Sequence, residues 1–157
     1  MPSRRVIVDT SPLIALDRIG KLWVLPKLYG TLVRPRSVLD EILDGGSVHG
    51  ASELLLNAAW LITEDDPREK AFRKELGSGE TAAITLAYLT KANLIVLDDL
   101  AARLVAASLG LKVTGTLGVL SAAHHRGLIA DLSIVLDDLQ ASGFRIAPEL
   151  LDRLRSP

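Results

Sequence analysis

The most constraining feature of the sequence is an uninterrupted apolar run, Leu-Ile-Val-Leu, at positions 94–97. A strand with no alternating polar residues is typical of a parallel sheet that is covered on both faces. A helical pattern follows at 100–109. The same order opens the chain, where an apolar run at 6–8 precedes a helix that begins near Pro12. Parallel strands joined by helices predict an α/β fold with helices on both sides of a mostly parallel sheet.

The rest of the chain repeats this alternation. Short apolar or β-branched runs next to turn residues predict further strands at 31–33, 60–62 and 112–114. Helical spacing and the placement of glycine and proline predict helices at 12–19, 22–28, 37–43 with a stop at Gly45-Gly46, 51–58, 67–77, 79–91 and 100–109.

The length of 157 residues fits one domain, and no linker, repeat or low-complexity segment divides the chain. We therefore expect a single three-layer α/β/α domain over residues 1–157. Its core should span about 5–116, followed over about 117–157 by two or three helices with turns at Gly127 and Gly143.

The composition narrows the classes of function. With 18 basic and 19 acidic residues, the net charge of −1 argues against a globally positive nucleic-acid binder. The absence of cysteine excludes disulfides, thiolate metal sites and cysteine nucleophiles, so any metal must bind to oxygen or histidine. No apolar run approaches the roughly 20 residues of a membrane span, and no signal peptide is evident. A cytoplasmic protein without membrane association is expected.

Carboxylates follow two of the expected strands directly. Asp9 comes after the first strand, and Asp98-Asp99 come after the run at 94–97. In open α/β sheets the carboxyl ends of the strands line the working crevice, so these acids should meet at one edge. Each also has a structural explanation, because an acid at this point can cap the next helix, and Arg103 can pair with Asp99.

Two glutamates extend the acidic set. Glu80 begins a helix and shares a face with Ala83, Ile84 and Ala87, so it points toward protein unless it only serves the helix N-terminus. Glu41 lies among apolar positions on a short helix, and by itself it has the pattern of a solvated surface residue.

These residues occur in an order that resembles the PIN-domain family. The order is Asp9-Thr10-Ser11-Pro12-Leu13, then Pro35 with Val38 and Glu41-Ile42, then Gly77-Ser78-Gly79-Glu80, then Leu97-Asp98-Asp99 with Ala102-Arg103, and finally Gly115-Thr116-Leu117-Gly118-Val119-Leu120. The resemblance runs from about residue 6 to about residue 146. More narrowly, the sequence resembles the bacterial and archaeal PIN-type proteins that carry a Gly-Glu helix start and a Gly-Thr-x-Gly-Val-Leu signature.

The resemblance implies a Rossmann-like sandwich and a metal-dependent nuclease that acts on RNA, often as the toxin of a toxin–antitoxin pair. The matching acids, expected to be both catalytic and metal-binding, are Asp9, Glu41, Glu80 and Asp98 or Asp99, with either aspartate of the last pair able to lead. Thr10, Ser11 and Thr116 match accessory polar positions. Leu100 departs from the family pattern, which often has a basic residue there.

The chemistry of such an acidic cluster is consistent with a divalent cation. Four or five carboxylates close together repel unless some bind protons or a cation neutralises them. Mg²⁺ and Mn²⁺ prefer oxygen ligands and activate a bound water for in-line attack on phosphorus. We therefore expect Mg²⁺ or Mn²⁺ as the cofactor, with one or two ions.

Substrate and partners follow as expectations. Arg34, Arg36 and Arg103 are candidate contacts for RNA phosphates, although ordinary ion pairing would also explain them. An antitoxin protein and a homodimer are expected partners. A non-catalytic PIN-fold module that binds nucleic acid or protein is the alternative, and a DNA nuclease would share the mechanism.

Overall fold

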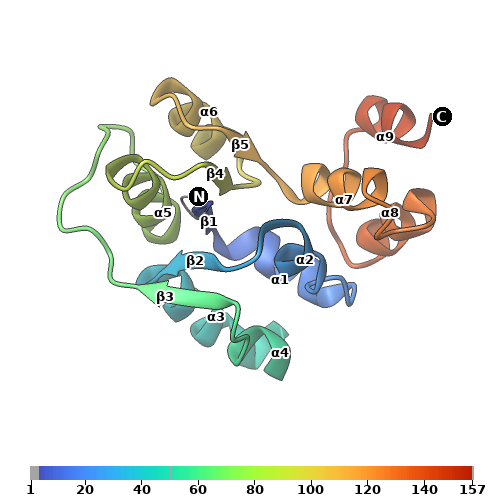
Figure 1. Cartoon of the computed structure of the whole chain (residues 1–157), viewed down its shortest axis with the longest axis horizontal. Helices are drawn as coiled ribbons and strands as arrows, with labels where there is room; N and C mark the ends of the chain where they lie inside the picture. Colours follow the sequence, from blue (N-terminus) through green and yellow to red (C-terminus); the bar gives the residue numbers. More distant parts are fainter. Residues whose placement is uncertain (1–3, 50, 157) are drawn as a thin grey trace.

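The computed structural model describes residues 4–49 and 51–156. Its centre is a five-stranded sheet in the order β3-β2-β1-β4-β5, and every neighbouring pair is parallel. The expected α/β/α fold is confirmed (Figure 1). The strands are β1 (Val6–Val8), β2 (Leu32–Pro35), β3 (Leu61–Glu64), β4 (Leu94–Val96) and β5 (Val113–Thr114).

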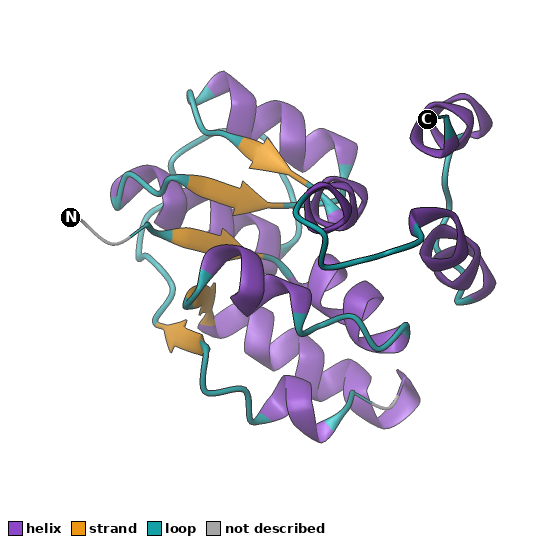
Figure 2. Ribbon diagram, turned by 45° about the vertical axis from the view of Figure 1, so that its right-hand side comes forward, coloured by secondary structure: helices purple, strands orange, loops and turns teal. Residues whose placement is uncertain are grey.

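Helices cover both faces of the sheet (Figure 2). None of those in the described part of the chain is long and apolar enough to cross a membrane. They are α1 (Thr10–Arg18), α2 (Val24–Tyr29), α3 (Arg36–His49), α4 (Glu53–Leu56), α5 (Ser78–Leu89), α6 (Leu100–Ser108), α7 (Thr116–His125), α8 (Leu132–Ala141) and α9 (Pro148–Arg155).

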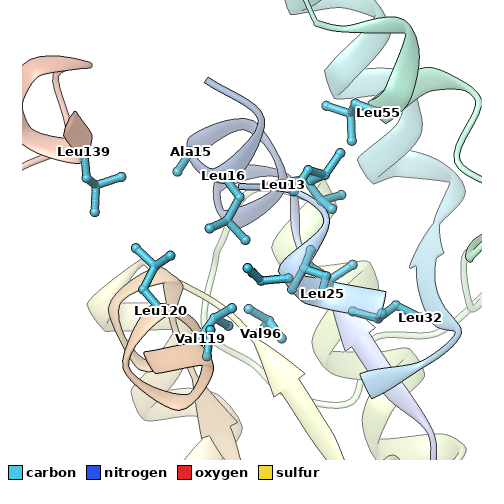
Figure 3. Packing of buried hydrophobic residues seen from close by; sticks show 14 of the residues in the cluster. Leu13, Ala15, Leu16, Leu25, Leu32, Leu55, Val96, Val119, Leu120 and Leu139 are labelled. Atoms are coloured by element: carbon cyan, nitrogen blue, oxygen red, sulfur yellow. The ribbon is translucent and has the colours of Figure 1, made fainter. Parts of the chain in front are cut away.

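The buried strands divide the core into two clusters. In β1, Val6 and Val8 belong to the larger cluster and Ile7 to the smaller, as expected when successive side chains point to opposite faces of the sheet. The larger cluster joins β1, β2 and β4 to side chains of α1–α4, α7 and α8, and Figure 3 shows Leu16 of α1 and Leu120 of α7 within it. The smaller cluster lies against α5 and α6.

The structure corrects one expected helix. Residues 67–77 form no helix but an irregular segment of bends, in which Phe72 and Leu76 pack against the smaller core cluster. The segment is dominated by charged side chains and has too few apolar residues for a continuous helical stripe. The segment is also tied down by the N–H of Ala71, which donates to Thr85 Oγ1 at 3.2 Å.

Most of the other helices lie within one or two residues of their expected bounds, and α3 and α4 differ most. The helix expected to stop at Gly45-Gly46 continues as α3 to His49, since a glycine weakens a helix by only about 1 kcal/mol relative to alanine. The helix expected at 51–58 shortens to α4, where the Ser52 side chain caps the first turn by accepting from Leu55 N.

The sheet topology brings the carboxyl ends of β1 and β4 together. Because β1 and β4 are adjacent and in register, their carboxyl ends lie side by side, and the Asp9 N–H donates to Val96 O at 3.1 Å. The acids that follow the two strands are therefore delivered to one edge of the sheet.

Candidate metal and nuclease site

Asp9 lies at the centre of this edge. It follows β1, precedes the first turn of α1 and is only 3% exposed. Its Oδ1 is buried and has no hydrogen-bond partner among the residues that the structure describes. The pKa of Asp9 is raised to about 7, first by burial and then by the charges of Glu80, Glu41 and Asp98, against an opposing hydrogen bond from the Thr10 backbone.

Asp98 approaches from the end of β4. Both of its oxygens accept hydrogen bonds from Thr116, Oδ1 from the backbone N–H and Oδ2 from the hydroxyl, each at 2.7 Å. Burial raises the pKa of Asp98, and the bonds from Thr116 and the charge of Arg103 partly counter this. The side chain is thus fixed in orientation by the start of α7.

Glu41 links three helices. From α3, its Oε2 accepts from the Thr10 hydroxyl of α1 at 2.8 Å, and its Oε1 accepts from the Gly79 N–H in the first turn of α5 at 2.8 Å. An acceptor at a helix N-terminus satisfies a free N–H and benefits from the helix dipole. Glu41, although exposed, is therefore held in place beside the acidic edge.

Glu80 lies in the first turn of α5 and reaches back to accept from Gly77 N at 3.3 Å. Burial raises the pKa of Glu80, and the charge of Asp99 and then that of Glu41 add to the effect, while the bond from Gly77 lowers it. Glu80 therefore caps the start of α5 and also lies close to the other acids, two roles between which the sequence alone does not decide.

Asp98 and Asp99 take different places. Asp99 is the N-cap of α6, is exposed, and accepts from Ala102 N at 3.0 Å. Its charge acts on Glu80, whereas that of Asp98 acts on Asp9. Of the two aspartates, Asp98 is thus the one at the centre of the site, and Asp99 lies at its rim.

The donor chemistry fits a hard divalent cation. Asp9 and the three acids whose charges raise its pKa offer carboxylate oxygens, which Mg²⁺ and Mn²⁺ prefer as ligands. Asp9 Oδ1 accepts no hydrogen bond from the described residues, so it is available to bind a cation. The carboxylates are not closed into a ligand cage: no group of three or more histidine, cysteine or acidic side chains in the described part of the chain is arranged to hold a metal ion. Because these carboxylates repel one another, they are not expected to come together around a shared position when no cation is bound there.

The accessory polar residues separate into two kinds. Thr10 and Thr116 each orient one acid, Glu41 and Asp98 respectively, through the hydrogen bonds given above. Ser11 is exposed beside them on α1. The threonines are therefore positioning residues in the first turns of α1 and α7.

The three arginines are not equivalent. Arg34 is only 4% exposed, and its Nε donates to Thr63 Oγ1 on the neighbouring strand at 3.1 Å, so the structure does not bring it to the surface. Arg36 is exposed at the start of α3. Arg103 is exposed on α6, close enough to Asp98 to lower its pKa. Arg36 and Arg103 thus remain accessible to an anion.

Two glycines that the sequence analysis did not single out as functional residues shape the site. A methyl group on Gly79 would overlap the Glu41 carboxylate, and one on Gly115 would lie 2.8 Å from Asp98 Oδ1. Both glycines fall next to a proposed acid or its threonine, in Gly-Ser-Gly-Glu and Gly-Thr. That adjacency is the signal that could have identified them.

The buried position of Asp9 predicts how stability changes with pH in metal-free buffer. Its folded-state pKa of about 7 lies above the ordinary 3.8, so the folded state binds this proton more tightly and its stability falls as pH rises from about 4 to about 7. A rise of this size corresponds to at most roughly 4 kcal/mol. Asp9→Asn should remove this fall, so the variant should gain stability relative to the parent between pH 5 and pH 8. Urea unfolding with a chelator tests this, and identical pH profiles would contradict it.

The contact between α3 and α5 predicts the sign of a glycine substitution. An unhindered Gly→Ala change inside a helix stabilises it by about 0.5–1 kcal/mol. At Gly79, in the first turn of α5, the added methyl moves the end of the Glu41 side chain and breaks its hydrogen bond to the Gly79 N–H. The loss of a hydrogen bond to a charged group, about 1.5–3 kcal/mol, exceeds that gain, so Gly79→Ala should lower the free energy of unfolding. The exposed neighbour Ser78, substituted by alanine, is the matched control. A Gly79→Ala protein more stable than its parent in urea unfolding would show that Glu41 is not held there.

Comparison with known proteins agrees with this geometry. The family model DUF3368, described as a PIN domain, matches residues 5–156. Among solved structures, the chain is similar to a PilT N-terminus domain protein, SSO1118, from the hyperthermophilic archaeon Sulfolobus solfataricus P2. The TM-score is 0.59 with 14% sequence identity, covering 76% of this chain and 92% of that one, which shows a shared fold. No curated protein matches the sequence. Because the family match spans almost the whole length, the chain belongs to the PIN-domain family.

Proposed function

We propose that this protein is a Mg²⁺- or Mn²⁺-dependent endoribonuclease that hydrolyses RNA phosphodiester bonds at the acidic edge of its sheet. The observation that carries the proposal is the buried Oδ1 of Asp9, which has no hydrogen-bond partner among the described residues and whose negative charge is disfavoured by the charges of Glu80, Glu41 and Asp98. A buried carboxylate with negatively charged neighbours is typical of a functional site, and a bound cation would neutralise the charge of this one. The PIN fold, which is of a nuclease type, supports this class of chemistry.

The burial of the acids suggests their division of work. Asp9 and Asp98 are the more buried pair, and together they would hold the cation. Glu41, Glu80 and Asp99 lie nearer to solvent, where they would accept hydrogen bonds from water and orient it toward phosphorus. When bound, a divalent ion supplies an activated water and neutralises charge on the phosphate oxygens. No covalent bond to the protein is needed.

RNA is the proposed substrate, and an antitoxin protein and a homodimer are the proposed protein partners. Exposed leucines beside the acidic edge offer apolar surface for a partner: Leu100 is 70% and Leu104 is 63% exposed on α6. Leu100 follows Asp99 directly, so a protein bound there would lie close to the site.

The alternative from a different class is a PIN-fold module that binds nucleic acid or protein without turnover. The two functions differ in one respect that can be measured: a nuclease needs both the cation and the buried carboxylate, and a binding module needs neither for its affinity.

Cleavage assays with matched substitutions test the proposal. Labelled single-stranded RNA, structured RNA and DNA are incubated with Mg²⁺, with Mn²⁺ or with a chelator. RNA should be cleaved only with metal. Asp9→Asn and Asp98→Asn should each lower kcat by more than about 100-fold, because the loss of a residue that only orients a metal ligand already costs up to about that much. Asp138→Asn, an exposed aspartate on α8, should leave kcat unchanged.

The outcomes separate the candidate functions. Cleavage that persists undiminished in Asp9→Asn would remove the acidic site from the mechanism. RNA binding without any cleavage under either metal would favour the non-catalytic module, and preferential cleavage of DNA would reassign the substrate.

A further inference from the structure

A cavity of about 330 Å³ opens beside Asp98, between α1 and the connection from α8 to α9. Ser11 and Arg18 line it from α1, and Phe144 and Arg145 line it from the connection. The residues at positions 11, 14, 15 and 18 share one face of α1, as helical spacing requires. Asp98 thus belongs both to the acidic site and to the wall of this cavity.

The outer wall of the cavity is fixed by the end of α8. Gly143 has a φ of +101°, and its N–H donates to Gln140 O at 3.0 Å, while the Phe144 N–H donates to Leu139 O at 3.2 Å. These two bonds form a Schellman motif, which ends a helix in a defined turn. Figure 3 shows Leu139 of α8 on the side of α1 where Ala15 lies. The turn therefore holds Phe144 and Arg145 opposite α1.

Two positively charged side chains, Arg18 and Arg145, line the cavity. Arg18 and Arg145 are both exposed, and neither takes part in any of the ion pairs formed between described residues. Guanidinium groups bind phosphate oxygens through paired N–H donors. Two guanidinium groups line this cavity, which adjoins the acidic site through Asp98. They are placed to bind a phosphate that neighbours the reacting phosphate in a nucleic-acid chain.

We propose that this cavity is a nucleotide subsite, in which Arg18 and Arg145 bind the RNA backbone next to the scissile phosphate. The inference rests on the nuclease function proposed above and extends it to residues outside the acidic set. A volume of about 330 Å³ lies at the lower end of the range of small-molecule sites, which suits one nucleotide unit. Phe144 provides an aromatic side chain in the lining against which a base can pack.

Salt-dependent RNA binding tests the subsite separately from catalysis. Fluorescence anisotropy with a labelled single-stranded RNA is measured in an Asp9→Asn background with Mg²⁺. For single strands each phosphate contact contributes about 0.7 to the slope of log K against log salt, so Arg18→Ala with Arg145→Ala should flatten the slope by roughly 1.4. Lysine at both positions should restore most of the slope. Arg153→Ala, an exposed arginine on α9, is the matched control and should change nothing.

The result distinguishes the subsite from the proposed function. If the wild type cleaves RNA and the double alanine variant, with an unchanged melting temperature, keeps the parent slope, the subsite is overturned and the nuclease stands. If RNA is neither cleaved by the wild type nor bound by the parent, both proposals fall. A flattened slope with lysine rescue supports the subsite.

Discussion

Burial of the Asp9 carboxylate costs free energy unless a proton or a cation accompanies it, and the site is organised around this cost. The position is imposed by topology, because Asp9 continues β1 in the middle of the sheet and its N–H is bonded to Val96. The elements around it add negative charge from Glu41, Glu80 and Asp98 instead of a compensating arginine. In the absence of metal, protonation of Asp9 removes its buried negative charge, and the pKa of about 7 means that this proton is bound below about neutral pH.

Asp98 and Glu41 differ from Asp9 because both of their carboxylate oxygens accept hydrogen bonds, whereas Asp9 Oδ1 accepts none from the described residues. Asp98 takes two bonds from Thr116, and Glu41 takes one from Thr10 and one from Gly79. These donors come from the first turns of α7, α1 and α5, whose free N–H groups favour negative charge. The sheet thus supplies the buried acid, and helix starts orient Asp98 and Glu41 through hydrogen bonds.

The sequence predicts the parts of this arrangement that depend on local pattern. The strand ends predict Asp9 and the pair Asp98-Asp99 at one edge of the sheet, and the choice of Asp98 over Asp99 depends on its bonds from Thr116 in the structure. Glu41 could be found only through the family resemblance, because its role depends on a contact with Gly79, 38 positions away. The irregular segment at 67–77 and the cavity arginines also depend on packing between distant segments. Arg34 was expected to contact phosphate, but its position on an inner strand buries it, which its sequence neighbours do not reveal.

We expect a divalent cation to bind at the Asp9 carboxylate, whose Oδ1 has no hydrogen-bond partner among the described residues. The most direct measurement is thermal unfolding at pH 8 with increasing Mn²⁺, for the wild type and for Asp9→Asn. A ligand at 100 times its Kd stabilises the folded state by about 2.7 kcal/mol, so the wild-type Tm should rise by several degrees with Mn²⁺. The Tm of Asp9→Asn should stay nearly constant. An equal rise in both proteins, or no rise in the wild type at millimolar Mn²⁺, would contradict the account.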